Sequence, residues 1–216
     1  MKRLVLSGLL LAGAAGAQNL PTPASGDFIC VDGNLLQLRQ DAVAGILQGT
    51  RAGESFTLQQ QVTRGSQRFV NGPDSIQLNG DSLRLRRAGN VRQTCERVPA
   101  APVAGIVWGT VTKRDRMALP EGTRLKVLLV DAARADAPAL EIASMEIRST
   151  GNQAPYWFLI RYDPARAVQP ARPALLARVQ AANGALFYAT DQAHPLPDDG
   201  AAFPSPVELP LARAGG

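Results

Sequence analysis

Apolar and polar side chains alternate along much of this 216-residue chain. The alternation is clearest in five segments, at residues 36–39, 56–59, 82–86, 125–127 and 156–162. A period of two is typical of β-strands that bury one face and expose the other to water. No segment carries the sustained apolar stripe of an amphipathic helix. The pattern therefore predicts an all-β protein.

Turn-forming sequences separate these segments. Asn79-Gly80 and Asn183-Gly184 each lie between two apolar runs, and such pairs predict hairpin turns because both residue types tolerate a positive φ. Short strands spaced about ten residues apart are typical of small barrels and sandwiches. The turn spacing therefore agrees with the strand pattern.

A stretch rich in proline and alanine divides the chain. Residues 99–104 contain Pro99 and Pro102 and predict a short, semi-rigid linker. We therefore predict two domains, at residues 27–98 and 105–214. Both are small for an independent hydrophobic core, so a covalent cross-link in the shorter one is physically sensible.

The first residues predict export. Lys2 and Arg3 precede a short apolar run, and Ala15-Gly16-Ala17 supplies the small residues that a signal peptidase recognises. The apolar run is far shorter than the roughly 20 residues of a spanning helix. We expect residues 1–17 to be a signal peptide, and the mature protein to reside in the periplasm, in the cell envelope or outside the cell. No cysteine follows the small residues, so we expect no lipid attachment and no integral membrane segment after cleavage.

The charge of the chain does not favour nucleic acid as a partner. The sequence carries 23 basic and 18 acidic residues, and without Lys2 and Arg3 the net charge is +3. Arg84, Arg86 and Arg87 form the one basic cluster. Nucleic-acid-binding domains carry a stronger basic stripe, often interleaved with aromatic residues.

The two cysteines predict a structural cross-link. Cys30 and Cys95 are the only cysteines in a chain expected to leave the cytoplasm, so they should form a disulfide. Chain-entropy reasoning gives such a long loop a stabilisation of roughly 4 kcal/mol. We expect this bond to staple the first domain.

Residues suited to catalysis are scarce. His194 is the only histidine, and although Asp191 is close in sequence, no second histidine or free cysteine is available to complete a metal site. No Gly-x-Ser-x-Gly nucleophile motif occurs. We therefore expect no metal, no cofactor and no enzymatic activity.

Residues 27–98 carry a first set of motifs that occur in order. These are Phe28-Ile29-Cys30, Ser55-Phe56-Thr57-Leu58, Gly65-Ser66-Gln67-Arg68-Phe69, Asn79-Gly80-Asp81 and the closing Cys95. In them the chain resembles the bacterial inhibitors of C-type lysozyme. The resemblance implies an eight-stranded antiparallel β-barrel closed by its disulfide.

The same resemblance implies a contact surface. Family members insert a serine and a lysine from neighbouring loops into the lysozyme cleft. Here Ser66 corresponds to the serine, Asn79 stands at the lysine position, and Arg64 or Arg68 can supply the missing cation. The lysozyme contacts expected on this hypothesis are Ser66, Arg68 and Asn79.

Residues 105–214 carry a second set of motifs. These are 107–116, Leu119-Pro120-Glu121-Gly122, Leu128-Leu129-Val130-Asp131, Ala135-Asp136-Ala137-Pro138, 158–164 and Ala177-Arg178-Val179. In them the chain resembles the YbaY/YscW group of envelope lipoprotein domains, some of which act as chaperones or pilotins for type III secretion components. The resemblance implies a β-sandwich.

Two functions follow as hypotheses. The first is a non-enzymatic envelope protein whose sandwich binds a partner polypeptide, such as a secretion component, along an exposed edge strand. The alternative is an inhibitor of a lysozyme-like muramidase that acts by loop insertion from the barrel.

Overall fold

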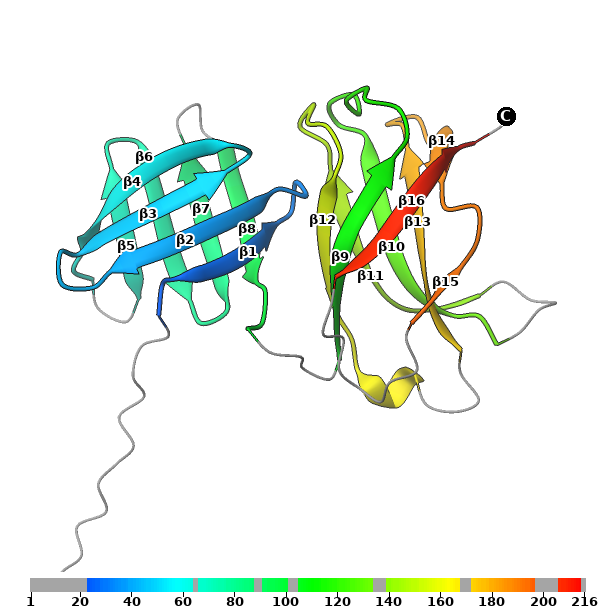
Figure 1. Ribbon diagram of the computed structural model, residues 1–216, viewed down its shortest axis with the longest axis horizontal. Helices are drawn as coiled ribbons and strands as arrows, with labels where there is room; N and C mark the ends of the chain where they lie inside the picture. Colours follow the sequence, from blue (N-terminus) through cyan, green and yellow to red (C-terminus); the bar gives the residue numbers. More distant parts are fainter. Residues whose placement is uncertain are drawn as a thin grey trace, which may run out of the picture.

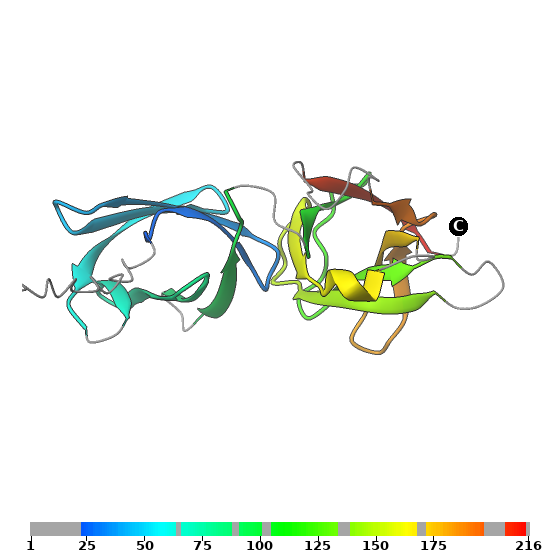
Figure 2. The same cartoon turned by 90° about the horizontal axis from the view of Figure 1, so that it is seen from below.

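A computed structural model describes residues 23–63, 66–87, 91–100, 105–133, 139–167, 172–196 and 206–214. Almost all regular structure in these residues is β-strand, with one short 3-10 helix, η1, at Pro164–Ala167. Two β-domains lie side by side (Figures 1 and 2). The all-β prediction is confirmed. The predicted signal peptide and residues 101–104 of the predicted linker lie outside the described residues.

The first domain is a closed antiparallel barrel. Its strands are β1 Gly26–Cys30, β2 Leu35–Asp41, β3 Ile46–Arg51, β4 Glu54–Gln61, β5 Gln67–Asn71, β6 Asp74–Asn79, β7 Ser82–Arg87 and β8 Val91–Arg97. Each strand pairs with the next, and β8 pairs with β1. Alternate residues point inward, so Leu36, Leu38, Leu83 and Leu85 are buried while their neighbours face outward. The barrel is the fold that the first resemblance implied.

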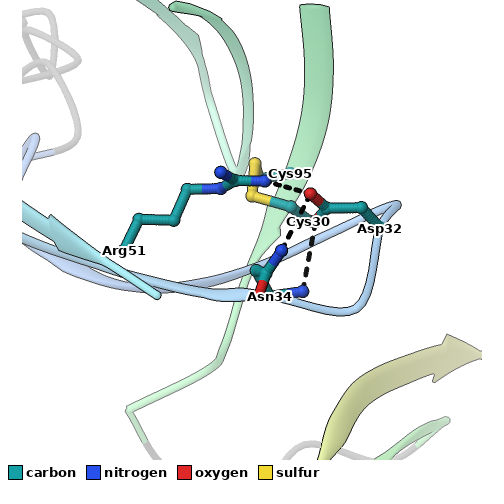
Figure 3. Close-up of a disulfide and its surroundings, with 5 residues drawn as sticks. All are labelled: Cys30, Asp32, Asn34, Arg51 and Cys95. Atoms are coloured by element: carbon teal, nitrogen blue, oxygen red, sulfur yellow. Dashed lines mark hydrogen bonds and ion pairs between the residues drawn. A yellow bond between two sulfur atoms is a disulfide. The ribbon is translucent and has the colours of Figure 1, made fainter. Parts of the chain in front are cut away.

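The disulfide joins the two strands that close the barrel. Cys30 and Cys95 are directly opposite in the β1–β8 ladder, and their sulfurs are bonded (Figure 3). Both residues are fully buried in the barrel core. The predicted cross-link is confirmed, and it fixes the strand pair whose residues are farthest apart in the sequence of this domain.

The second domain contains eight strands. They are β9 Ile106–Lys113, β10 Arg124–Asp131, β11 Leu140–Arg148, β12 Tyr156–Arg161, β13 Pro173–Gln180, β14 Leu186–Ala189, β15 His194–Pro195 and β16 Val207–Arg213. Their order in the sheet is β11-β10-β13-β14-β16-β9-β12, and β15 pairs with β13. One large core cluster, which includes Val107, Leu129, Phe158 and Leu209, fills the space that the sheet encloses.

The sheet of the second domain differs from the predicted sandwich. It is one continuous sheet that curls around its core, so that its two edge strands, β11 and β12, come close to each other. The short strand β14 makes the sheet continuous, because it pairs with β13 on one side and with β16 on the other. The result is a nearly closed barrel. A period of two could not distinguish this from a sandwich, because either arrangement buries one face of each strand.

The two domains meet where the β1–β2 turn of the first reaches the open edges of the second. The Trp157 N–H of β12 donates to the Gly33 carbonyl at 2.8 Å, and the Arg148 N–H of β11 donates to the Val31 carbonyl at 3.4 Å. The turn therefore accepts hydrogen bonds from both edge strands. It covers part of the two edges along which the sequence suggested that a partner strand could add.

An internal polar network holds this turn. The carboxylate of Asp32 is 2% exposed, forms an ion pair with Arg51, and accepts hydrogen bonds from the backbone N–H and the side-chain amide of Asn34 (Figure 3). Burial of a carboxylate is costly unless it is paired and hydrogen-bonded. Here each requirement is met by a residue of the barrel itself, so the turn has a defined shape that suits docking.

Apolar side chains complete the contact between the domains. Ile29 and Leu35 of the barrel belong to one cluster with Leu159, Trp108 and Trp157 of the second domain. The two indole rings stack with centroids 5.9 Å apart. Both tryptophans of the protein thus lie at the domain contact.

Candidate functional site

An apolar groove lies at one end of the second domain. Its lining residues come from the segment after β9, from β14 and from the end of β16: Met117, Ala118, Leu119, Pro120, Leu186, Phe187, Tyr188, Arg213 and Ala214. Its volume is about 340 Å³. Met117 is 64% exposed, Leu186 46% and Phe187 37%, and these three side chains lie together in the groove. The groove therefore gathers apolar surface that the fold itself does not bury.

A buried lysine fixes the segment that carries Met117. The Lys113 side chain is 1% exposed, and its ammonium donates hydrogen bonds to the Asp115 carboxylate and to the Met117 carbonyl. The Tyr188 hydroxyl donates to the other oxygen of Asp115 at 2.8 Å, and the ammonium lies 5.2 Å from the centroid of the Tyr188 ring. These contacts hold the Met117 backbone close to β14.

The charge of Asp115 is stabilised by the same contacts. The hydrogen bond from Lys113 lowers the pKa of the Asp115 carboxyl below its ordinary value, and the hydrogen bond from Tyr188 lowers it further. Asp115 is therefore an anion at neutral pH and neutralises the buried ammonium. The wall of the groove beside Met117 consequently carries no net charge from this pair.

A second tyrosine fixes the other end of the segment. The Tyr156 hydroxyl accepts a hydrogen bond from the Leu119 N–H at 3.4 Å and donates one to the Asn152 carbonyl at 2.8 Å. Burial raises the pKa of the Tyr156 hydroxyl, so it stays protonated and available as a donor. The Ser149 hydroxyl donates to the Leu119 carbonyl at 3.0 Å. Leu119 is thus fixed at both its backbone groups.

Cationic side chains border the groove on one side. A neighbouring hollow of about 490 Å³ shares Tyr188 and Arg213 with it and is also lined by Arg114 and Asp191. Arg114 and Arg213 are exposed, and within the part of the chain that the structure describes neither forms an ion pair. The hollow also holds the carboxylates of Asp115 and Asp191, so the charge at this border is mixed, with the exposed Arg213 at the edge of the apolar groove itself.

The three candidate contacts on the barrel lie near one another. Ser66 and Asn79 line one hollow of about 460 Å³, and Arg68 lines an adjoining hollow of about 480 Å³. The Ser66 hydroxyl accepts a hydrogen bond from the Gln77 side-chain amide at 3.3 Å. The structure therefore places Ser66, Arg68 and Asn79 on one surface. Arg64, the other cation considered, lies outside the described residues.

Sequence reasoning missed most of both surfaces. It did not single out Met117, Leu186 or Phe187. The signal for these three is weak, since isolated exposed apolar residues are common in proteins. On the barrel, the alternation at 82–86 already indicated that Arg84 and Arg86 share one face.

The described residues give no support for a metal site. Among them, no three histidine, cysteine, aspartate or glutamate side chains gather closely enough to hold an ion. His194 lies in β15, opposite Leu175 of β13, with its Nε2 atom buried. In the same described ranges, no helix has the length and the apolar character needed to cross a membrane.

Comparisons with known proteins concern the second domain. Residues 103–209 match the family model described as "Type III secretion system lipoprotein chaperone (YscW)". The curated protein "Uncharacterized lipoprotein YbaY" of Escherichia coli is 38% identical over 94 residues, which cover 44% of this chain. The chain spans about half the length of that relative (49%). The resemblance predicted for this domain is confirmed.

A solved structure is also similar. It is an alternative pilotin from the type II secretion system of Vibrio cholerae, with 31% sequence identity, a TM-score of 0.44, and coverage of 50% of this chain and 96% of that chain. The barrel and its disulfide agree with the fold expected for residues 27–98, and the resemblance of these residues to lysozyme inhibitors stays a prediction.

Proposed function

We propose that this protein is a non-enzymatic binding protein of the cell envelope whose second domain holds a partner polypeptide in the apolar groove. The observation that carries the proposal is the gathering of Met117, Leu186 and Phe187 in one groove. Exposed apolar side chains that cluster, rather than lie singly, mark interaction surfaces. Full burial of a wholly exposed side chain of this size is worth about 1.5–3 kcal/mol, so a partner that covers the exposed parts of these three side chains gains roughly 0.5–2 kcal/mol from each.

The shape and charge of the groove select the partner. An amphipathic segment can place apolar side chains on Met117 and Phe187 and an acidic side chain beside Arg213. This mode of binding resembles the helix-in-groove recognition found in many protein complexes. The second domain also offers less edge for strand addition than its topology suggests, because the β1–β2 turn already accepts hydrogen bonds from β11 and β12.

The relatives of the second domain agree with this role. The matched family is named for lipoprotein chaperones of type III secretion, and the curated relative is named as a lipoprotein. From these names we infer that this protein also lies in the cell envelope and binds a polypeptide partner, such as a component of a secretion system. The predicted signal peptide leads to the same compartment.

A site-specific cross-linker tests the groove. We would replace Phe187 with a photoreactive phenylalanine analogue, replace Leu140 in the same way as a control, and irradiate cells that export the protein. Leu140 is 68% exposed and lies on β11, outside the groove. A partner captured at position 187 and not at position 140 is then purified for binding measurements.

The binding measurements decide the proposal. Leu186→Ser should lower the affinity for the purified partner at least tenfold, whereas the affinity of Leu140→Ser should stay within twofold of that of the unmodified protein. The same exposed residue type is changed in both variants, so a general loss of apolar surface cannot explain a difference. Equal cross-linking at the two positions, or equal affinity of the two variants, would contradict a role for the groove.

Lysozyme inhibition by the barrel is the second candidate. The observation that favours it is the placement of Ser66, Arg68 and Asn79 on one surface of a closed, disulfide-bonded barrel. Titration of the purified protein against C-type lysozyme acting on cell walls tests this hypothesis. No inhibition at micromolar excess of the protein rejects it.

A further inference from the structure

Four arginines lie on one outer face of the barrel. Strands β5, β6, β7 and β8 are neighbours, and their registers place Arg68, Gln77, Arg84 and Thr94 in one row across the four strands. A second row places Ser75, Arg86 and Arg92 opposite one another. Adjacent strands are about 4.8 Å apart, so Arg68 and Arg84 are separated by about 10 Å across the face.

The other arginines that the structure describes in the barrel each form an ion pair with a carboxylate, which makes this face different. Arg39 pairs with Asp27, Arg51 with Asp32, Arg87 with Asp74, and Arg97 with Asp81. In contrast, Arg68, Arg84 and Arg92 have no carboxylate partner within the described ranges, and all three are exposed. The barrel thus concentrates its uncompensated positive charge on one side.

This face is also hollowed. The two hollows of about 480 and 460 Å³ share Gln77, Arg84 and Thr94, so they run into each other across the strands. No aspartate or glutamate belongs to the lining of either hollow. We call this surface, lined by Arg68, Arg84, Arg92, Ser66, Ser75, Gln77, Ser82 and Thr94, the cationic face. It can hold an extended ligand that carries several negative charges.

The lining chemistry narrows the class of ligand. A guanidinium group donates two parallel hydrogen bonds to a carboxylate, and its planar fork gives that contact its direction. Between the arginines stand the hydroxyls and amides of Ser66, Gln77 and Thr94, which suit a ligand rich in hydroxyl groups. We propose that the cationic face binds an acidic polysaccharide, a glycan chain whose sugar units carry carboxylates.

Two other partners fit the cationic face less well. The residues that contribute most to protein interfaces are tryptophan, tyrosine and arginine, and no aromatic residue lines either hollow. Membrane-surface segments insert apolar side chains between lipids. The apolar residues beneath this face, Leu83 and Leu85, are each 1% exposed and unavailable for either purpose. A polar, charged and hollowed face is left, which favours a glycan.

Binding to defined polymers tests the proposal. The purified exported protein is titrated with polygalacturonate, with uncharged dextran, with vesicles containing phosphatidylglycerol, and with C-type lysozyme. Polygalacturonate should bind, and its affinity should fall steeply as salt is raised because the contacts are exposed ion pairs. Dextran should not bind. Binding of dextran at equal strength, or a stronger preference for the vesicles or for lysozyme, would overturn the proposal.

A matched pair of variants locates the site. Arg84→Gln should lower the affinity for polygalacturonate at least tenfold. Arg39→Gln removes the same charge from another part of the barrel, and its affinity should stay within twofold of that of the unmodified protein. Arg84→Lys keeps the charge without the planar fork and should give an intermediate loss. Thermal denaturation confirms that the variants are folded. Equal losses in Arg84→Gln and Arg39→Gln would show that net charge alone is responsible, and would refute a defined site.

Discussion

The docking of the two domains depends on a glycine at position 33. Gly33 lies in the β1–β2 turn with a φ of +76°, and its carbonyl accepts the hydrogen bond from the Trp157 N–H. A Cβ atom added there would lie 3.0 Å from Cγ2 of Ile147 and 3.2 Å from Cβ of Tyr156. We therefore predict that Gly33→Ala separates the turn from the second domain.

The size of the effect has two parts. A left-handed backbone costs an L-residue roughly 1–2 kcal/mol. The second part comes from the contact itself: Ile147 and Tyr156 are fully buried and cannot easily move aside, so the turn must withdraw and leave the Trp157 N–H without its partner. An unpaired donor at a buried contact costs about 1–3 kcal/mol. The sum is roughly 2–5 kcal/mol, of which the second part acts only on docking.

Gly53→Ala is the matched control. Gly53 has a φ of +82° in the same barrel, and a Cβ there would meet no atom within 4 Å. This variant carries the backbone cost without disturbing the second domain. A comparison of the two variants therefore isolates the contact between the domains.

Tryptophan fluorescence is the direct assay. Trp108 and Trp157 are the only tryptophans and both pack in the apolar cluster at the contact. Emission of Gly33→Ala should shift to longer wavelength under native conditions, as water reaches the indole rings, while that of Gly53→Ala should match the unmodified protein. An unshifted spectrum for Gly33→Ala, with a denaturation midpoint equal to that of Gly53→Ala, would refute the reasoning.

Three further predictions concern single residues. Cys30→Ser should cost roughly 2–5 kcal/mol and unfold the barrel while the second domain stays folded, as followed by amide hydrogen exchange; a barrel that stays protected would contradict this. The pKa of the Asp115 carboxyl is lowered, first by the hydrogen bond from Lys113. The carboxylate therefore stabilises the fold fully above the ordinary carboxyl pKa, and this stabilisation is lost as pH falls through the lowered pKa. Asp115→Asn should remove this part of the acid dependence of the denaturation midpoint, and an unchanged pH profile would count against the network. Gly109→Ala should detach β16 and broaden its amide resonances, because the added Cβ would lie 1.9 Å from the Val207 carbonyl oxygen; a native spectrum would show that the parallel pairing tolerates a side chain.

The strands of the barrel could be predicted from the sequence because their information is local. Alternation at 36–39, 56–59 and 82–86 gives each strand its inward face, and hairpin turns such as Asn79-Gly80 join consecutive strands that are also neighbours in space. The one non-local pairing, β1 with β8, is marked by Cys30 and Cys95. The pattern itself left a sandwich and a small barrel open, and the closed barrel was implied only by the resemblance to lysozyme inhibitors.

The second domain could be predicted only in part because its topology is not local. β16 pairs in parallel with β9, which lies about a hundred residues earlier, and the pairing depends on the missing side chain of Gly109. A glycine in a strand marks a close approach of backbones without naming the partner. Alternation therefore indicated two of the strands, at 125–127 and 156–162, but gave neither the order of the strands nor the curl of the sheet.

The apolar groove was missed for a similar physical reason. Met117 and Phe187 are 70 positions apart and belong to no shared pattern, and they meet because Lys113, a charged residue near the end of an alternating strand, is buried under Tyr188. A lysine in such a position is usually solvated. The sequence alone gives no means of recognising this exception.

Tyr156 connects the domain contact with the groove. Its backbone and Cβ pack beside Gly33 of the barrel, whereas its hydroxyl binds the Leu119 N–H in the wall of the groove. The ring between them is fully buried and has little freedom to absorb a displacement. Withdrawal of the β1–β2 turn would therefore relax the packing on one end of this side chain and loosen the hydrogen bond at the other.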